Sequence, residues 1–314
     1  MLDPQTQGVL TAMAQNGIPA IHTLAPEQAR EAYISRRDIV QPAARAVGQV
    51  KDIDVAGPDG PITVRYYHPS GGTNLGLLPA LVYFHGGGFV IGSIESHDRL
   101  CRELCMQANC IVVSVDYRLA PEHRYPAAAT DCLAATRWVH QHSAELGVDP
   151  SRIAVGGDSA GGQLAAVTTL ALRDDPTLNL AFQLLIYPVT DVLMTSDSIE
   201  RNGEGYLLGK LDLRYFYEHY FDPKADRSAP MASPLRAPDL TGLPPAFVLT
   251  AGFDPLHDEG LAYADALSAA GVNTQYICFA RQVHGFILMG KLIEEANFAV
   301  STCSLALQRA LHQE

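Results

Sequence analysis

The pentapeptide Gly157-Asp158-Ser159-Ala160-Gly161 places a serine between small residues, directly after a short apolar run. This pattern predicts a strand that turns sharply into a helix. A turn that tight leaves room only for small neighbours and lifts the serine hydroxyl clear of the backbone as a nucleophile. A serine hydroxyl is a poor nucleophile near neutral pH. The chain must therefore supply a base, an acid that orients it, and donors for an oxyanion.

His284 is the candidate base among the 11 histidines of the chain. It follows a predicted strand at 274–279 after a short loop, at the carboxyl end of the last strand of the chain. The carboxyl ends of parallel strands meet at one edge of a sheet, the edge that presents Ser159. We expect His284 to take the proton of Ser159.

Two aspartates compete for the acid. Asp254 follows the predicted strand at 246–250 and its loop, whereas Asp191 follows the predicted strand that ends at Tyr187. The chain order Ser159, Asp254, His284 matches the order of nucleophile, acid and histidine in α/β-hydrolases and favours Asp254. Its carboxylate would hold the imidazole in the right tautomer without taking the proton. Asp191 stays open as the rival.

The neighbours of Asp254 have other interpretations. Asp258 and Glu259 are typical of the first turn of a helix, where carboxylates complement the helix dipole. Asp254, His257 and Asp258 also resemble a metal cluster. Three ligands on one short loop need a geometry that nothing in the sequence specifies, so we expect no metal here.

The segment His85-Gly86-Gly87-Gly88-Phe89 is the candidate oxyanion loop, because it follows a buried apolar strand. Consecutive glycines let backbone N–H groups approach a ligand without a Cβ in the way. The amide of Ala160, directly after the nucleophile, should add a donor. The helix that begins at Ala160 would direct its dipole toward the same negative charge.

The elements around these residues predict an α/β fold with a doubly wound, mostly parallel sheet and an antiparallel start. Continuous apolar runs indicate strands buried on both faces, and helical stretches alternate with them. The predicted strands lie at 80–85, 110–117, 152–156, 182–187, 246–250 and 274–279, after a hairpin of 50–55 and 62–68. Two amphipathic helices are expected at 5–15 and 26–37.

The segment 191–239 interrupts this alternation, because it contains no predicted strand. It has a polar loop and an aromatic-rich helical stretch at 211–220. With the N-terminal helices it would cover the carboxyl ends of the strands. We therefore divide the chain into N-terminal cap helices (1–45), a first part of the core (46–190), a cap insertion (191–239) and a second part of the core (240–314).

Composition narrows the class of protein. The 314 residues are 47% hydrophobic and 18% charged, and the formal net charge of -12 argues against a nucleic-acid partner. No apolar stretch is long enough to span a bilayer, and the N-terminus lacks the pattern of a secretory signal, so a cytoplasmic location is expected. The 6 cysteines lie mostly in apolar segments, as small buried side chains. Cys101 and Cys105 are one helical turn apart, but without a second pair they do not indicate a metal site.

Five blocks of sequence together resemble the hormone-sensitive-lipase-like family of esterases, bacterial family IV. They are His85-Gly86-Gly87-Gly88-Phe89, Asp116-Tyr117-Arg118-Leu119-Ala120-Pro121-Glu122 with Tyr125-Pro126-Ala127, the segment around Ser159, Asp254-Pro255-Leu256 with Asp258-Glu259-Gly260, and His284-Gly285-Phe286. The resemblance runs from about residue 79 to the C-terminus, and Asp158 before the nucleophile is similar to one branch of the family.

The resemblance implies an α/β-hydrolase fold with a helical cap and a carboxylesterase that cleaves short- to medium-chain esters. It assigns nucleophile, acid and base to Ser159, Asp254 and His284, and the oxyanion donors to Gly87, Gly88 and Ala160. It also implies no cofactor or metal, a small-molecule ester substrate and a homodimer. Candidate pocket residues, each of which also fits ordinary packing, are Phe89, Asp158, Tyr206, Leu207, Tyr215, Phe286 and Ile287.

Two other functions fit the same residues. Arylamide cleavage, as an amidase or deacetylase, uses the same triad, and the sequence does not separate it from ester cleavage. A small-molecule receptor is the third candidate, because the gibberellin receptor resembles this family. That receptor lacks the family's catalytic histidine, whereas His284 is present here.

Overall fold

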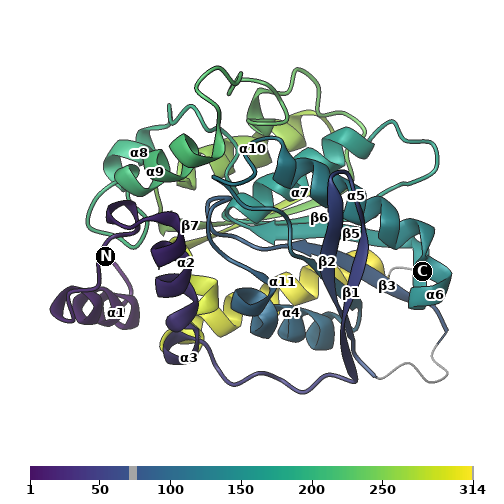
Figure 1. Ribbon diagram of the computed structural model, residues 1–314, viewed down its shortest axis with the longest axis horizontal. Coiled ribbons are helices and arrows are strands. Elements are labelled where there is room, and N and C mark those ends of the chain that lie inside the picture. Colours follow the sequence, from purple (N-terminus) through teal and green to yellow (C-terminus); the bar gives the residue numbers. More distant parts are fainter. Residues whose placement is uncertain (71–75, 313–314) are drawn as a thin grey trace.

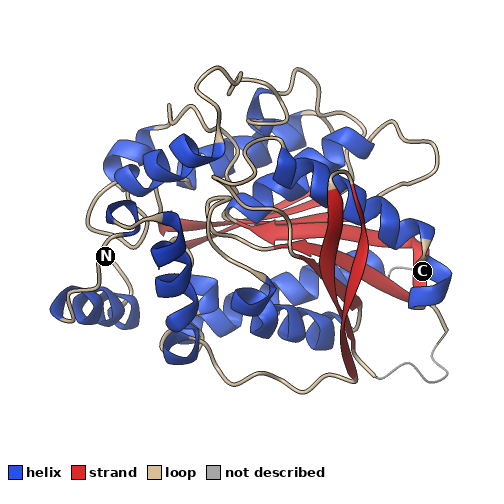
Figure 2. Ribbon diagram, in the orientation of Figure 1, coloured by secondary structure: helices blue, strands red, loops and turns tan. Residues whose placement is uncertain are grey.

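One mixed sheet carries the fold. The computed structural model describes residues 1–70 and 76–312, and within them eight strands follow the order β1-β2-β4-β3-β5-β6-β7-β8 (Figure 1, Figure 2). β2 pairs antiparallel with both β1 and β4, and every pair from β4 to β8 is parallel. The strands are β1 (Gln49–Gly57), β2 (Gly60–His68), β3 (Leu78–Phe84), β4 (Ile111–Val115), β5 (Val148–Asp158), β6 (Phe182–Ile186), β7 (Ala246–Phe253) and β8 (Thr274–Val283). The predicted α/β class with an antiparallel start is confirmed.

The central strands are continuous apolar runs because helices cover both faces of the sheet. Every residue of β3, β4 and β6 is buried. On one face lie α4 (Ile94–Ala108) and α11 (Glu294–Leu311). On the other lie α5 (Ala127–Gln141), α7 (Ala160–Leu172) and α10 (His257–Ala269), as Figure 1 shows. The short helix α6 (Ser143–Leu146) precedes β5. Each face has its own apolar core.

Two strands extend further than the apolar runs indicate. β5 includes Asp158 and so ends directly at Ser159. β8 continues to Val283, because it pairs again with β7 at Phe253 after an irregularity in the register. His284 is therefore the first residue after a strand, not a residue of a loop that follows one.

The N-terminal helices and the segment 191–239 contact the loops that follow the parallel strands. The N-terminal elements are α1 (Pro4–Gln15), η1 (Ile21–Thr23), α2 (Pro26–Ser35) and α3 (Arg37–Val40). From α2, Arg30 donates to the carbonyls of Val90 (2.8 Å) and Ala120 (2.8 Å), which follow β3 and β4. The segment 191–239 carries α8 (Asp197–Arg201), α9 (Lys210–Tyr220) and η2 (Pro234–Arg236). From α9, Tyr220 stacks on Phe89 with 3.9 Å between ring centroids.

A side-chain contact joins these two segments, which are far apart in the chain. His22 Nδ1 lies 2.7 Å from Asp212 Oδ1, and the His22 N–H donates to the same oxygen at 3.2 Å. Figure 1 shows the N-terminal helices beside α8 and α9 on the same side of the molecule. Among the helices that the structure describes, none is long and apolar enough to cross a membrane.

Candidate active site

Ser159 sits at the junction of β5 and α7 in a strained backbone conformation. Its φ is 58° and its ψ is -119°, a region that costs a non-glycine residue about 1–3 kcal/mol. The flanking glycines are required by close packing against the end of β3. A Cβ on Gly157 would lie 2.3 Å from the carbonyl oxygen of Phe84, and one on Gly161 only 1.9 Å from it. The turn is thus pressed against β3 and presents the side chain of Ser159 beyond the strand end.

Ser159, His284 and Asp254 form one hydrogen-bonded chain. Ser159 Oγ lies 2.8 Å from His284 Nε2, and His284 Nδ1 lies 2.7 Å from Asp254 Oδ2. Asp254 is fully buried, and its other oxygen accepts the Leu256 N–H at 2.8 Å. A proton on Nδ1 that is donated to Asp254 leaves Nε2 free to accept the Ser159 proton. This arrangement can activate a hydroxyl for attack on a carbonyl carbon.

Asp191, the rival acid, has a different partner. Both of its oxygens accept from the Arg236 guanidinium, at 2.9 Å and 2.7 Å. Burial opposes ionisation, but the Arg236 guanidinium outweighs it and lowers the pKa of Asp191 below its ordinary value. Asp191 is committed to an ion pair, and Asp254 is the aspartate that contacts His284.

The alternative metal cluster is not assembled. Asp258 accepts from the Ser198 N–H at 2.8 Å and from Arg201 at 2.7 Å, while His257 Nδ1 lies 3.9 Å from Cys278 Sγ. Asp254 faces His284 instead. In residues 1–70 and 76–312, no group of three or more His, Cys, Asp or Glu side chains could hold a metal ion.

The glycine-rich loop presents unused backbone donors next to the nucleophile turn. Gly87 and Gly88 have φ of 125° and 59°, and the Gly87 carbonyl accepts from the N–H groups of Val90 (3.1 Å) and Ile91 (2.9 Å). Within the described chain the N–H groups of Gly87 and Gly88 donate to no other group. Two free N–H groups at the end of β3 can therefore receive an oxyanion.

Two aromatic residues that the sequence did not single out line this site. A Cβ on Gly88 would lie 2.2 Å from Phe216 Cγ, so the Phe216 ring covers the glycine-rich loop. The Tyr187 ring centroid lies 4.7 Å from that of His284. Tyr187 ends a predicted strand that pairs with the strand before Ser159. That position could have indicated Tyr187 as a residue of the site. Phe216 is the middle one of three consecutive aromatic residues that point in different directions around the helix, so the sequence did not indicate which of them faces the site.

The candidate pocket residues differ in their neighbours and in their burial. Leu207 packs beside the residue after the histidine, because its Cδ2 lies 3.6 Å from where a Cβ of Gly285 would be. Tyr206 packs on Phe253 and Tyr215 on His219. The other four are buried at 3% exposure or less: Phe89 against Tyr220, Phe286 and Ile287 in the core on the α4 and α11 face, and Asp158 beneath the nucleophile turn. Asp158 accepts from the Tyr83 hydroxyl and from the Gly86 N–H.

Comparisons with known proteins agree with this geometry. A family model described as the alpha/beta hydrolase fold matches residues 81–288. The chain is 42% identical to the carboxylic ester hydrolase LipN of Mycobacterium tuberculosis, over 93% of this chain and 78% of that protein. It is 39% identical to an ethyl acetate hydrolase of Pseudomonas putida, over 93% of this chain and 92% of the relative.

Solved structures show the same likeness in three dimensions. The crystal structure of LAE6, an alpha/beta hydrolase enzyme from the metagenome of Lake Arreo, superposes with a TM-score of 0.95. That alignment has 43% sequence identity and covers 98% of both chains. The nucleophile turn, the buried acid and the histidine thus stand in a framework shared with these relatives. This chain belongs to the alpha/beta hydrolase fold family, among the hormone-sensitive-lipase-like enzymes.

Proposed function

We propose that this protein is a carboxylesterase that cleaves short- to medium-chain carboxylic esters through an acyl-enzyme. The observation that carries the proposal is the hydrogen-bonded chain from Ser159 through His284 to Asp254, which ends beside two free backbone N–H groups. A hydroxyl, a base and oxyanion donors are what acyl transfer from an ester requires. The relatives named as a carboxylic ester hydrolase and an ethyl acetate hydrolase support the choice of ester as substrate.

In the first half of the reaction, Ser159 Oγ attacks the ester carbonyl carbon while His284 Nε2 takes its proton. Asp254 stabilises the imidazolium that forms, and its full burial keeps this interaction unscreened by solvent. The carbonyl oxygen becomes an oxyanion that accepts from the N–H groups of Gly87, Gly88 and Ala160. The C–O bond to the alcohol then breaks, and the alcohol leaves with the proton from His284.

In the second half, a water molecule takes the place of the alcohol. His284 removes a proton from the water, the hydroxide attacks the acyl carbon, and the same three N–H groups hold the second oxyanion. The carboxylic acid leaves as Ser159 recovers its proton from His284. Each half begins and ends with a neutral imidazole, so the cycle needs no other acid or base.

We also propose that residues 1–45 and 191–239 together form the cap that selects the substrate. The contacts of Arg30 with the loops after β3 and β4, and of Phe216 with Gly88, support this division. We further propose that the protein is cytoplasmic and forms a homodimer. Support for a reducing compartment comes from the 6 free cysteines, and the dimer follows from the family resemblance.

Replacing the nucleophile tests the proposal directly. Ser159→Ala should lower kcat on p-nitrophenyl butyrate by at least about 10³-fold, because the acyl-enzyme cannot form. Ser301→Ala, on the exposed face of α11, is the matched control and should keep full activity. Full activity of Ser159→Ala would end the proposal. A matched aryl ester and anilide, compared on the wild-type protein, separate esterase from amidase activity.

A further inference from the structure

A buried carboxylate joins the nucleophile turn to the oxyanion loop. Asp158, directly before Ser159, is 2% exposed, and its Oδ1 accepts from the Gly86 N–H at 3.0 Å and from the Tyr83 hydroxyl at 2.7 Å. The same carboxylate occupies the space beside Gly86: a Cβ there would lie 2.3 Å from Asp158 Oδ2. Any residue with a Cβ at this position would clash with Asp158, so the position requires glycine. One side chain fixes the distance between the turn that carries Ser159 and the loop that carries Gly87 and Gly88.

The carbonyl of Gly86 is held as firmly as its N–H. His85 Nδ1 lies 2.8 Å from the Gly86 carbonyl oxygen, and burial lowers the pKa of His85 to about 3, so a neutral ring donates this bond. The Gly86 carbonyl and the Gly87 N–H belong to one planar trans peptide and point in opposite directions. Holding the carbonyl on one side therefore directs the Gly87 N–H to the other. The direction of an oxyanion donor is thus set by groups that never touch the substrate.

His97 supplies the partner that Asp158 needs inside the protein. Its Nε2 lies 3.2 Å from Asp158 Oδ1 and 3.3 Å from Oδ2. Both side chains are almost wholly buried. Burial acts to raise the pKa of Asp158, but His97 and the Tyr83 hydroxyl outweigh it and lower that pKa below its ordinary value. The carboxylate is therefore ionised where it accepts the Gly86 N–H.

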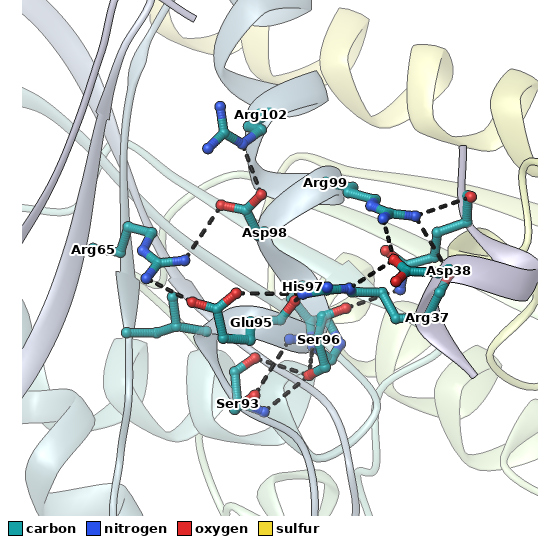
Figure 3. A network of polar contacts seen from close by, with 12 residues as sticks. Arg37, Asp38, Arg65, Ser93, Glu95, Ser96, His97, Asp98, Arg99 and Arg102 are labelled. Carbon is teal, nitrogen blue, oxygen red and sulfur yellow. Dashed lines mark hydrogen bonds and ion pairs between the residues drawn. The ribbon is translucent and has the colours of Figure 1, made fainter. Parts of the chain in front are cut away.

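The other nitrogen of His97 is bound to the first turn of α4. Figure 3 shows His97 beside Ser93 and Ser96, and His97 Nδ1 lies 2.8 Å from Ser96 Oγ. Ser96 Oγ donates to the Ser93 carbonyl (2.8 Å) and accepts the Ser93 N–H (2.9 Å). With its single proton used, Ser96 Oγ accepts from Nδ1, and Nε2 faces a carboxylate. Nε2 also accepts from the Gly86 N–H at 3.3 Å, so His97 contacts both partners of the bond between Asp158 and Gly86.

Ion pairs hold the turn that carries His97. In Figure 3, Arg65 of β2 bridges Glu95 (2.7 Å) and Asp98 (3.5 Å), and Arg99 pairs with Asp38 of the N-terminal segment. Arg65 lies on β2 and Asp38 on α3, whereas the residues that they contact all lie on α4. The first turn of α4 is thus fixed to the sheet on one side and to α3 on the other, and His97 is fixed with it.

We propose that Asp158 and His97 are positioning residues for ester hydrolysis: Asp158 anchors the Gly86 N–H and so aligns the oxyanion donors with Ser159, and His97 holds both the carboxylate and the Gly86 N–H in place. The inference rests on the proposed carboxylesterase function. Neither residue touches the substrate. Their loss therefore acts on the oxyanion, in the transition state, and leaves binding of the uncharged ester nearly intact.

Asp158→Asn and Gly86→Ala test the two sides of the contact. Asn keeps the size but loses the charge, whereas Ala keeps all charges but pushes the carboxylate away. Because complete loss of one oxyanion donor costs about 10²–10³ in kcat, a misaligned donor should cost about 10- to 100-fold, with KM within about threefold. His97→Gln should act like Asp158→Asn. Values of kcat are taken per active site, counted by titration with a fluorophosphonate, so that misfolded protein is excluded.

A transition-state analogue separates positioning from a structural role. Ser159 attacks the carbonyl carbon of an alkyl trifluoromethyl ketone and forms an oxyanion. The Ki of the ketone should therefore rise by the same factor by which kcat/KM falls. Asp131→Asn is the matched control, because Asp131 is an equally buried carboxylate paired with Arg118 outside the site. It should lower the unfolding temperature and leave kcat per site and the ketone Ki unchanged.

The outcomes are distinct. Parallel losses of kcat and ketone affinity in Asp158→Asn and Gly86→Ala support the inference, and if Asp158→Asn does not fold, Gly86→Ala decides alone. A Gly86→Ala protein with wild-type kcat and ketone Ki would overturn it. A folded wild-type protein that hydrolyses no ester would overturn the proposed function first, and the inference with it.

Discussion

The ring of Phe216 fills the space that a side chain at Gly88 would need, with 2.2 Å between Phe216 Cγ and an added Cβ. Gly88 also has a φ of 59°, where a residue with a Cβ is strained. Gly88→Ala should therefore shift both the loop and the ring, and lower kcat on p-nitrophenyl butyrate by about 100-fold. The double variant Gly88→Ala with Phe216→Ala should recover part of this loss, since it removes the clash and leaves only the strain. Equal activity of the single and double variants would mean that the two residues are not coupled.

The two aspartates at strand ends should differ sharply. Asp254→Asn removes the acceptor that orients His284, and a loss of about 10³–10⁴ in kcat is expected. Asp191→Asn breaks the bidentate pair with Arg236 and should lower the unfolding temperature, while kcat stays within about threefold of the wild type. Steady-state kinetics and thermal unfolding on both variants check this. A reversal of the two phenotypes would transfer the role of the acid to Asp191.

Glu259 should make the free energy of unfolding depend on pH. The carboxyl is 2% exposed, and burial raises its pKa well above the ordinary value, although it accepts from the N–H groups of Thr190 (2.8 Å) and Asp191 (3.2 Å). The folded state keeps this proton where the unfolded chain releases it. Its contribution to stability is therefore full below about pH 4 and declines as pH rises through the raised pKa.

The variant Glu259→Gln cannot titrate at this position. As pH rises above the ordinary pKa of a glutamate, the free energy of unfolding of the wild type, minus that of the variant, should fall, by at most about 1.4 kcal/mol per pH unit. Urea unfolding at three pH values measures it. Glu204→Gln, on an exposed loop, is the control and should show a constant difference. Parallel pH curves for the wild type and Glu259→Gln would contradict the buried-acid interpretation.

Cys278 should be the most reactive thiol of the chain. Burial opposes ionisation, but His257 Nδ1, 3.9 Å from the sulfur, outweighs it and lowers the pKa of Cys278 below its ordinary value. The other five cysteines are buried, and burial raises the pKa of each. Iodoacetamide at pH 7 should label Cys278 first, as peptide mass spectrometry can show. His257→Gln should slow that labelling about tenfold, and an unchanged rate would exclude the pairing.

Local patterns in the sequence predicted the architecture because the central strands β3, β4 and β6 are buried on both faces and read as apolar runs. Parallel pairing puts the carboxyl ends of β5, β7 and β8 at one edge of the sheet, and so brings Ser159, Asp254 and His284 together there. The sequence predicted the ends of the strands less accurately than their centres. β8 reaches Val283 through polar residues, because pairing with Phe253 resumes after an irregularity that no pattern of residue types encodes.

Contacts between distant segments were beyond the sequence. Glu259 is in the first turn of its helix, as expected, but its carboxyl bonds to the backbone of residues 190–191 instead of serving mainly the helix dipole. Phe216 covers Gly88, which is more than a hundred residues earlier in the chain. Both facts depend on how one element docks on another. Residue type limits such contacts but does not specify them.

The carboxylate of Asp212 accepts from both the backbone and the ring of His22, and from the Gly209 N–H at the start of α9. Two segments that lie almost two hundred residues apart in the chain therefore depend on each other for this contact. A chimaera that imports residues 191–239 from a relative must import the N-terminal helices as well. Recombination at a single crossover between the two segments would combine His22 of one parent with residues 191–239 of the other, and could lose the contact with Asp212.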